Sequence, residues 1–362
     1  MKKYLLIGDG ESPHILKWAR ELTKHFELYL VSSRDVDPGI REILPEERIH
    51  AFRLNVAESG GNLKFYRMIL PLIRIINQIK PDYVNAHYIT SHGLLAALAK
   101  KIARKNFVLI QTAWGTDILV TPFRNKFYKG ITRFALKQAQ LVTSDSRLVA
   151  EIVQGLCSTP TTTFPFGLDF LPEVLPEEKD PNLFFSNRTL IANSNIDRVL
   201  HFFSKVHDSN HNAKLIIANE GPMKNSLTEL SEQLGISPAV NFVGFITPDE
   251  QDELYRKSQF YFSVLSSDAL SVSLLEAMAH GCIPIVSDLP DNRDWVKDGE
   301  NGIVLLPGTR PDVITDIQKK STEIFENNRE LIQKNAIFPG AIIDYCNLLN
   351  ELKNNSLRIL QH

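Results

Sequence analysis

The chain has 362 residues, of which 43% are hydrophobic and 23% charged, and this is the composition of a globular protein long enough for two domains. The formal net charge of −2 argues against nucleic acid as the main partner. The cysteines are odd in number, far apart and without metal-ligand spacing, so we expect a reducing compartment and no zinc; they are Cys157, Cys282 and Cys346. No apolar run approaches the roughly 18 residues that a membrane-spanning helix needs.

The first half of the chain alternates strands with helices. Apolar runs predict buried strands at 4–7, 28–32, 83–86 and 107–111. Helices are expected between them, including 66–80 and 93–103. Such alternation predicts a parallel sheet with right-handed crossovers.

Polar residues follow several of these strands. The turn Gly8-Asp9-Gly10 would let backbone approach a ligand closely, although a tight turn explains the glycines equally well. His14 either touches a substrate or lies on the surface of the first helix. Asp117 either binds a hydroxyl group of a ligand or caps a helix.

The segment 124–137 is basic and amphipathic, because five arginines and lysines alternate with aromatic and aliphatic residues. It could lie on an anionic membrane surface. The alternative is an ordinary surface helix whose apolar stripe packs on the core.

A proline-rich, strand-poor run at 159–182 marks a domain boundary. Beyond it, strands are expected at 183–186, 214–218, 240–244, 260–265 and 283–287, with a turn at 288–292. Arg188 follows the first of these strands directly. Asn219 begins a turn, since asparagine tolerates the left-handed backbone conformation. After residue 306 the pattern is helical and ends with a helix at 341–352.

The segment 263–302 carries the most informative pattern. Leucine, alanine and methionine recur there at helical spacing, which predicts a helix that begins near Ser271. The amides of its first turn make a site suited to a phosphate or a carboxylate. Asp268 precedes the helix and Glu276 lies one to two turns into it, so two carboxylates are expected around one anion site. This site lies at the carboxyl end of a strand, where open parallel sheets place their ligands.

This segment resembles the retaining glycosyltransferases of family 4, of the group 1 type. The family signature is an acidic residue, seven residues, a glutamate and Ala-Met-Ala-x-Gly-x-Pro, and it stands here as Asp268-x7-Glu276 continuing to Pro284. The string GDGESPHILKW at 8–18 resembles the opening of the same family. The resemblance implies an α/β protein of the GT-B fold, in which two Rossmann-like domains face a cleft and a C-terminal helix crosses back to the N-terminal domain.

The domain bounds that follow are an N-terminal acceptor domain at 1–168, a hinge at 169–182, a donor-nucleotide domain at 183–340 and a terminal helix at 341–362 that packs on the first domain.

The resemblance also implies roles for individual residues. Glu276 would hold the ribose hydroxyls of the donor, Asp268 its sugar and Arg188 its diphosphate. Further donor contacts would come from Ser271, Val272, Ser273, Leu274, Asn193, Asn195, Gly244 and Phe245. The acceptor side of the cleft would be formed by Gly10, Glu11, His14, His87, Trp114 and Asp117. For Phe245, core packing is an equally good explanation.

Three positions depart from the family pattern. Asp268 replaces the usual glutamate, and no lysine accompanies Arg188, because 193–195 reads Asn-Ser-Asn. Trp114 stands where the family often has the histidine of His-Gly-Thr. Because tryptophan cannot transfer a proton, this loop would supply no general base, and Trp114 would stack on a sugar or wall the cleft.

Together these roles predict a retaining, metal-independent glycosyltransferase without a cofactor. It would move a sugar from a nucleoside diphosphate donor, with UDP favoured, to a hydroxyl of a glycan or lipid-linked glycan in bacterial cell-surface polysaccharide synthesis. The leaving phosphate would take the acceptor proton, so that catalysis is mainly positioning and charge stabilisation. The protein is expected in the cytoplasm, with peripheral contact to the inner face of the membrane through 124–137.

Two other functions compete with this one. The three departures would also suit a GT-B subunit that has lost turnover and binds or stabilises a partner glycosyltransferase. A phosphorylase or nucleotide-sugar epimerase of the same fold is the third possibility, and it would release sugar phosphate or isomerise the donor without an acceptor.

Overall fold

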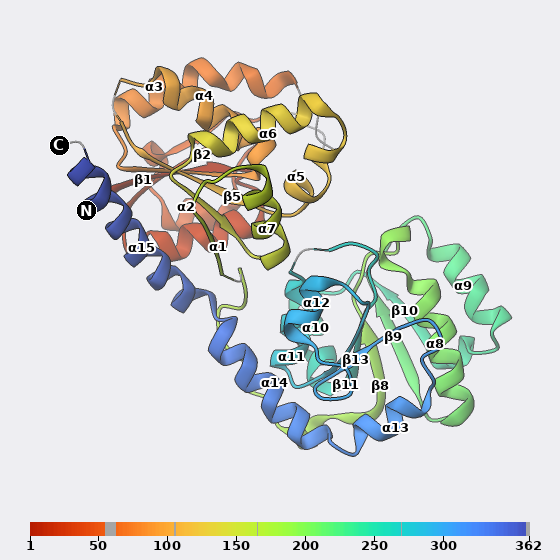
Figure 1. Cartoon of the computed structure of the whole chain (residues 1–362). Coiled ribbons are helices and arrows are strands. Elements are labelled where there is room, and N and C mark those ends of the chain that lie inside the picture. Colours follow the sequence, from red (N-terminus) through yellow and green to blue (C-terminus); the bar gives the residue numbers. More distant parts are fainter. Residues whose placement is uncertain (55–62, 105, 165, 269, 360–362) are drawn as a thin grey trace. The chain divides into compact units, whose positions relative to one another are not determined.

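The computed structural model describes residues 1–54, 63–104, 106–164, 166–268 and 270–359, which fold into two compact units (Figure 1). The first unit comprises Met1–Phe164 and Pro339–His362, and the second comprises Pro165–Phe338. Within the described part of the chain, no helix is both long and apolar enough to span a bilayer.

The first unit is built on a parallel sheet of seven strands in the order β3-β2-β1-β4-β5-β6-β7. The strands are β1 (Lys3–Gly8), β2 (Glu27–Ser32), β3 (Ile49–Ala51), β4 (Tyr83–His87), β5 (Val108–Ala113), β6 (Leu141–Ser144) and β7 (Thr161–Thr163). The strand order reverses between β1 and β4, and parallel pairing of Ile7 with Ala86 brings the loops after these two strands together. A ligand site is expected at this reversal.

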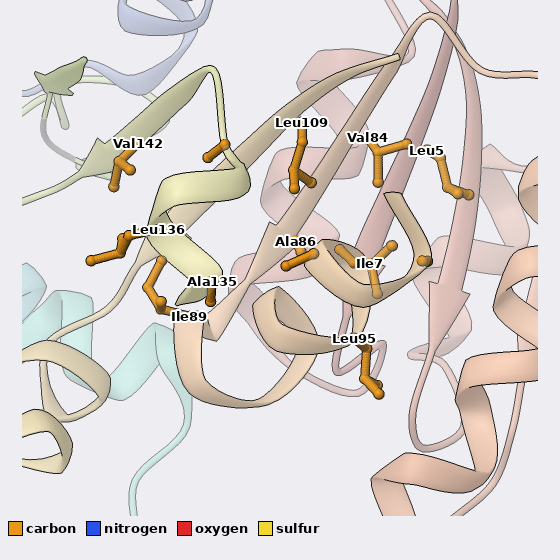
Figure 2. Packing of buried hydrophobic residues seen from close by; sticks show 14 of the residues in the cluster. Leu5, Ile7, Val84, Ala86, Ile89, Leu95, Leu109, Ala135, Leu136 and Val142 are labelled. Carbon is orange, nitrogen blue, oxygen red and sulfur yellow. The ribbon is translucent and has the colours of Figure 1, made fainter. Parts of the chain in front are cut away.

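Helices cover both faces of this sheet (Figure 1). They are α1 (Pro13–Leu22), α2 (Pro38–Ile43), α3 (Ile69–Ile79), α4 (Leu94–Ile102), α5 (Thr116–Leu119), α6 (Lys126–Gln138), α7 (Arg147–Leu156) and α15 (Phe338–Ile359), with shorter turns η1 (Glu46–Arg48), η2 (Leu63–Met68), η3 (Tyr88–Gly93) and η4 (Thr121–Phe123). Leu5 and Ile7 point to the face covered by α3, α4 and α6, and Figure 2 shows this core. Tyr4, on the opposite face, shares a 2.7 Å hydrogen bond with Tyr345 of α15. Because successive side chains of β1 point to opposite faces of the sheet, this strand packs against helices on both sides.

The second unit has a parallel sheet of six strands in the order β10-β9-β8-β11-β12-β13. Its strands are β8 (Asp180–Ser186), β9 (Lys214–Ala218), β10 (Val240–Gly244), β11 (Ser258–Ser263), β12 (Ile283–Val286) and β13 (Ile303–Val304). Its helices are α8 (Ile196–Ser209), α9 (Lys224–Gln233), α10 (Pro248–Lys257), α11 (Val272–Ala279), α12 (Pro290–Trp295), α13 (Asp312–Gln318) and α14 (Ser321–Asn335), with short turns η5 (Pro176–Glu178), η6 (Ala192–Ser194) and η7 (Ser237–Ala239).

Aromatic side chains fill the core of this unit. The rings of Phe184 and Phe260 stack with centroids 4.6 Å apart, on the face that packs against α8 and α9. Phe185 and Tyr261, on the other face, pack with α10 and α11. The strand order reverses between β8 and β11, so the loops after these strands are where a ligand site is expected.

The two ends of the second unit lie side by side. The Leu168 amide donates to the carbonyl of Ala336 at 2.8 Å, and the Phe338 amide donates to the carbonyl of Leu168 at 2.8 Å. Gly167 is required here, because a Cβ atom at this position would lie 2.1 Å from the Ala336 oxygen. The beginning and the end of the unit are thus bonded to each other.

The predicted fold class is confirmed, since both units are Rossmann-like parallel sheets. The strands predicted at 214–218 and 240–244 have the predicted bounds. Three short strands, β3, β6 and β7, were not predicted, and β7 lies in the run 159–182 that we expected to be strand-poor. The turn expected at 288–292 was wrong in part, because α12 begins at Pro290. Proline is favourable in a first helical turn.

Candidate functional site

Arg188 lies at the reversal point of the second sheet, in the loop after β8 and directly after Asn187. Its Nη2 donates to the hydroxyl of Ser263 at 2.7 Å and also to the hydroxyl of Ser271. The Oδ2 atom of Asp268 lies 3.7 Å from Nη2, and the Arg188 side chain is 14% exposed. A guanidinium with this little exposure is held in one place, next to the start of α11.

The helix that the sequence predicts to begin near Ser271 is α11, and Ser271 is its N-cap residue. Its hydroxyl accepts from the Leu274 amide at 3.2 Å. The first turn of the helix begins at Val272 and continues with Ser273. Amides at a helix N-terminus and a neighbouring arginine both favour an anion, so the region around Arg188 and Ser271 is suited to a phosphate group.

Asn193 and Asn195 hold the loop that carries Asp268. The Asn193 side chain donates to the Ser267 carbonyl at 2.9 Å and accepts from its amide at 3.1 Å. The Asn195 side chain donates to the carbonyl of Val264 at 2.8 Å. Both asparagines therefore fix the backbone after β11, and their contact with a ligand remains a prediction.

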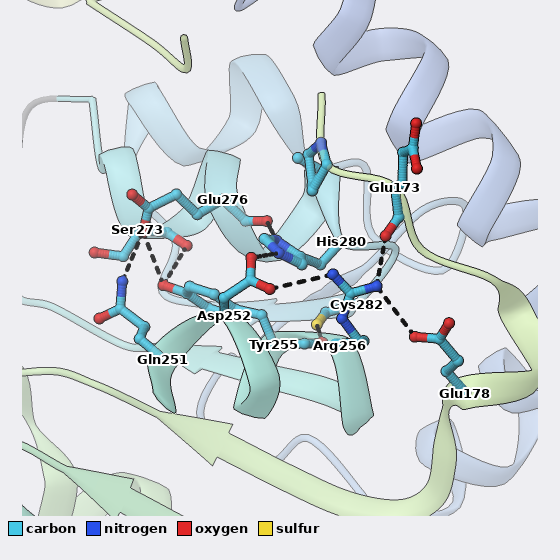
Figure 3. Close-up of polar contacts among 12 residues, drawn as sticks. Glu173, Glu178, Gln251, Asp252, Tyr255, Arg256, Ser273, Glu276, His280 and Cys282 are labelled. Atoms are coloured by element: carbon cyan, nitrogen blue, oxygen red, sulfur yellow. Dashed lines mark hydrogen bonds and ion pairs between the residues drawn. The ribbon is translucent and has the colours of Figure 1, made fainter. Parts of the chain in front are cut away.

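Glu276 lies on the face of α11 that meets α10 (Figure 3). Its Oε2 atom accepts from Nε2 of Gln251 at 3.3 Å and from the hydroxyl of Tyr255 at 3.2 Å. The carboxylate is half-buried, and two neutral donors orient it.

A second contact between the same helices involves His280. Its Nδ1 atom is 2.7 Å from the Glu276 carbonyl and its Nε2 atom is 2.7 Å from Oδ1 of Asp252 (Figure 3). A carbonyl and a carboxylate only accept, so both bonds require a proton on each ring nitrogen or one on Asp252. Arg256 donates to Asp252 at 3.2 Å and to Glu178 at 3.3 Å, which extends this chain of contacts to the segment before β8.

Phe245 follows β10 and its side chain is 78% exposed. The alternative that Phe245 serves core packing is therefore wrong. Gly244 before it has φ +75°, a conformation that favours glycine, and its carbonyl accepts from the Asn219 amide at 2.6 Å. Asn219 has φ +89°, which confirms the predicted left-handed turn.

In the first unit, Gly10 and Glu11 lie in the loop after β1. The Gly10 amide donates to the Ser32 hydroxyl at 2.8 Å, and a Cβ atom at Gly10 would lie 2.6 Å from Cγ1 of Val36. Close packing against the loop after β2 thus explains this glycine. Glu11 forms an ion pair with Arg34 at 3.0 Å.

Aromatic and histidine rings gather beside this loop. The ring of Trp114, after β5, lies 4.4 Å from that of His14 and 5.5 Å from that of His87. Trp114 Nε1 donates to Nδ1 of His87 at 3.1 Å. Tyr88 stacks on Trp114 at 6.0 Å and has φ +66°, a strained conformation for a residue with a side chain. His14 is half-buried, so it is not a fully solvent-exposed residue of α1, and burial lowers its pKa.

Asp117 is buried in the first turn of α5. Gly115, rather than Asp117, is the N-cap of that helix. The two carboxylate oxygens accept from the Ile89 amide at 2.8 Å and from the Trp114 amide at 3.1 Å. Burial raises the pKa of Asp117 to about 6. Asp117 thus joins the loops after β4 and β5, and a hydrogen bond to a ligand hydroxyl remains a prediction.

Sequence reasoning missed the residues around Glu276. Gln251 and Tyr255 are four positions apart, which places them on one face of α10. The sequence does not reveal that this face meets α11. Asn187 could have been recognised from the sequence as a candidate site residue, because it is a polar residue between a buried strand and Arg188.

The chain matches two family models. The model described as "Glycosyl transferase 4-like" matches residues 3–146, and the one described as "Glycosyl transferases group 1" matches residues 169–337. The predicted anion site lies in the second match.

Named relatives share parts of the chain. The α-monoglucosyldiacylglycerol synthase of Streptococcus pneumoniae is 28% identical over 169 residues, which are 41% of this chain and 38% of the relative. The N-acetyl-α-D-glucosaminyl L-malate synthase of Bacillus anthracis is 25% identical over 240 residues, which are 63% of this chain and 62% of the relative. The chain thus spans less than two thirds of the length of either relative.

Among solved structures, Anabaena HepE in complex with UDP has a TM-score of 0.71 over 100% of both chains. The sequence identity is 13%, so this likeness shows the fold alone.

Proposed function

Because the chain belongs to the group 1 glycosyltransferases of the GT-B fold, we propose that it transfers a sugar from a UDP-sugar to a hydroxyl of a glycan or glycolipid. The observation that carries this proposal is the convergence of Arg188 and Ser271 at the start of α11. A diphosphate needs positive charge and backbone amides, and both are present there. The UDP bound to HepE supports the donor class, and the names of the two relatives, which make glycosylated products, support sugar transfer.

The donor would be held in the second unit. Arg188 and the amides of Val272 and Ser273 would bind the diphosphate, while Glu276 would accept hydrogen bonds from the ribose hydroxyls. Asp268 would contact the sugar. Phe245 would lie against the nucleotide base, which its 78% exposure supports.

The reaction would proceed with retention of configuration and without a metal. The acceptor oxygen would form its bond to the anomeric carbon on the face from which the diphosphate leaves. The bond between that carbon and the phosphate oxygen breaks, and this oxygen takes the acceptor proton. Arg188 would stabilise the charge that develops on the leaving group. Trp114 contributes no proton transfer in this scheme.

We further propose that the acceptor is lipid-linked and that the start of α6 contacts an anionic membrane. The core-packing alternative describes only the second part of this helix, where Thr132, Ala135 and Leu136 are buried. At its start Phe127 is 71% exposed, next to the exposed Lys126 and Lys129. Apolar side chains among exposed cations suit the surface of an anionic bilayer. The name of the Streptococcus pneumoniae relative, a glycolipid synthase, supports such an acceptor. The reaction would then serve cell-surface glycan synthesis from the cytoplasmic side.

The donor proposal is tested by the thermal midpoint of the purified protein with UDP, other nucleoside diphosphates and their sugars, with and without EDTA. Ligands that bind the folded state raise the midpoint. We expect UDP and one UDP-sugar to raise the thermal midpoint, and we expect each rise to be the same with and without EDTA. Arg188→Ala should lower kcat by about 100-fold or more, whereas Glu276→Ala should mainly raise the KM for the donor.

Arg198→Ala is the matched control, because Arg198 in the same unit donates to the Leu305 carbonyl. It should leave both constants near those of the wild type. Full activity of the Arg188 and Glu276 variants would remove the site assignment. Nucleotide binding without transfer to any acceptor would favour the non-catalytic subunit instead.

The membrane proposal is tested by sedimentation with vesicles of phosphatidylglycerol or of phosphatidylcholine. Binding to the anionic vesicles that weakens in Phe127→Ala would support it. Equal sedimentation with both lipids would oppose it.

A further inference from the structure

The side-chain amide of Asn187 joins three residues of the second unit. Its Oδ1 atom accepts from the Tyr261 hydroxyl at 2.7 Å. Its Nδ2 atom donates to Oε1 of Gln251 at 2.8 Å and to the Tyr255 hydroxyl at 2.9 Å. Gln251 and Tyr255 are also the residues that donate to Glu276. Asn187, Gln251, Glu276 and Tyr255 therefore close a ring of hydrogen bonds.

The carboxylate of Glu276 determines how the side-chain amides of this ring are oriented. An ionised carboxylate only accepts, so Gln251 must present its NH2 group to it, while the one hydroxyl proton of Tyr255 is shared between Glu276 and the Ser273 carbonyl, each at 3.2 Å. Gln251 then has its oxygen turned to Asn187, and Asn187 must present its NH2 group in return. A reversed Asn187 amide would take the Tyr255 proton away from Glu276. The side-chain amides of Gln251 and Asn187 therefore each have one orientation that satisfies the ring.

Burial keeps this arrangement rigid. The Tyr255 side chain is 1% exposed, and its ring lies 5.5 Å from that of Tyr261 and 5.3 Å from that of Phe185. Burial also raises the pKa of Tyr255 well above its usual range, so its hydroxyl stays a donor at neutral pH. Figure 3 shows Gln251, Tyr255 and Glu276 together between α10 and α11.

We propose that Asn187, Gln251 and Tyr255 are positioning residues that hold the Glu276 carboxylate in the orientation that accepts the ribose hydroxyls of the donor. This inference rests on the proposed function. Asn187 precedes Arg188 in the chain, so one strand end supports both the residue for the ribose and the residue for the diphosphate. None of the three positioning residues needs to touch the donor.

The test compares two ligands in two matched variants. Isothermal titration would give the Kd of UDP and of 2′,3′-dideoxy-UDP, whose ratio reports the contact with the ribose hydroxyls alone. Tyr255→Phe removes a donor to Glu276. Tyr261→Phe removes a buried hydroxyl that donates to Asn187 and is the control. Such a cycle between a side chain and a ligand group isolates their coupling.

We expect the wild type and Tyr261→Phe to bind UDP about tenfold or more tightly than 2′,3′-dideoxy-UDP, since each hydrogen bond from a ribose hydroxyl to a charged group contributes appreciably to the binding free energy. In Tyr255→Phe the preference for UDP should fall to about threefold. The KM for the UDP-sugar should rise, while kcat should stay nearly unchanged. Gln251→Ala, a change on a half-buried helix face, should reduce the preference in the same way. It replaces Tyr255→Phe if that variant does not fold.

The outcomes separate the two proposals. If the wild type does not bind UDP, the proposed function fails. If the wild type prefers UDP and both Tyr255→Phe and Gln251→Ala keep the full preference, the positioning inference is wrong while the donor site stands.

Discussion

The indole nitrogen of Trp114 donates a hydrogen bond to Nδ1 of His87 at 3.1 Å, and this bond determines which ring nitrogen of His87 carries the proton. Indole nitrogen only donates, so Nδ1 must be unprotonated and Nε2 must hold the proton. Burial lowers the pKa of His87 well below its usual range, which keeps the ring neutral. Trp114 therefore makes His87 a neutral donor at Nε2, next to the loops after β1 and β4.

We expect this tautomer to be visible by nitrogen-15 NMR. In the wild type, Nδ1 of His87 should have the shift of an unprotonated nitrogen from pH 5.5 to 8, and Nε2 that of a protonated one. Trp114→Phe removes the hydrogen-bond donor and should allow both tautomers, while UDP affinity should stay unchanged because the proposed UDP site lies in the other unit. His14→Gln, which leaves the Trp114 bond intact, is the control. A protonated Nδ1 in the wild type would contradict the assignment.

Asp117→Asn should destabilise the first unit. Each Asp117 oxygen accepts one backbone amide, from Ile89 and from Trp114, and an asparagine would point its NH2 group at one of them. An unmatched buried donor costs about 1–3 kcal/mol. Denaturant unfolding measures this change. Asp37→Asn is the control, because the Oδ1 of Asp37 accepts from Gly39 at 2.8 Å and an amide oxygen can do the same. Equal stability of the two variants would refute the two-acceptor role.

Phe245→Ala should weaken nucleotide binding without loss of stability. The side chain is 78% exposed, so its removal leaves the core intact. Stacking of an aromatic ring on a base contributes about 1–3 kcal/mol, which corresponds to at least a fivefold rise in the Kd of UDP. Titration calorimetry and thermal unfolding provide the two values. Phe170→Ala removes another ring of the same unit, 73% exposed, and should change neither. Unaltered UDP affinity in Phe245→Ala would exclude the base contact.

Acid should destabilise the protein partly through His92. Burial lowers the pKa of His92 to about 4, whereas an unfolded histidine titrates near about 6.5. Below pH 6.5 the unfolded chain thus binds a proton that the folded chain does not, so the free energy of unfolding falls as the pH falls. The loss due to His92 should reach about 2 kcal/mol at pH 5.

The comparison that isolates His92 is the unfolding free energy of the wild type and of His92→Gln at pH 7 and pH 5. Asp117 has the opposite effect, because its raised pKa stabilises the folded state as the pH falls from 6 toward 4. Since Asp117 is present in both proteins, its effect cancels in the difference. If the wild type and His92→Gln lose the same free energy of unfolding between pH 7 and pH 5, His92 does not titrate in this range.

Local patterns predicted the start of α11 and the turn at Asn219 well. Ser271 precedes a run with helical periodicity, and a serine there satisfies an amide of the first turn. The strands that escaped prediction are only three or four residues long, which is too short for a clear alternating pattern; β7, for instance, is Thr161–Thr163.

Side-chain direction was harder to predict than secondary structure. Phe245 and Phe242 are both aromatic residues near the end of β10, yet Phe245 is exposed while Phe242 packs on the core. Tyr255 reaches Glu276 across 21 positions of sequence, and only the packing of α10 on α11 determines that contact. Such relationships depend on how whole elements pack, which local periodicity does not encode.

The backbone hydrogen bonds between Leu168 and the residues around Ala336 suggest how the second unit could be expressed by itself. The second unit is one continuous segment of the sequence, inserted between the two segments that form the first unit. Residues near the two ends of this inserted segment are hydrogen-bonded to each other. A coding segment for 166–338 would include its whole sheet and both bonded ends. Such a fragment would allow the proposed nucleotide site to be studied in about half of the chain, apart from the proposed acceptor site.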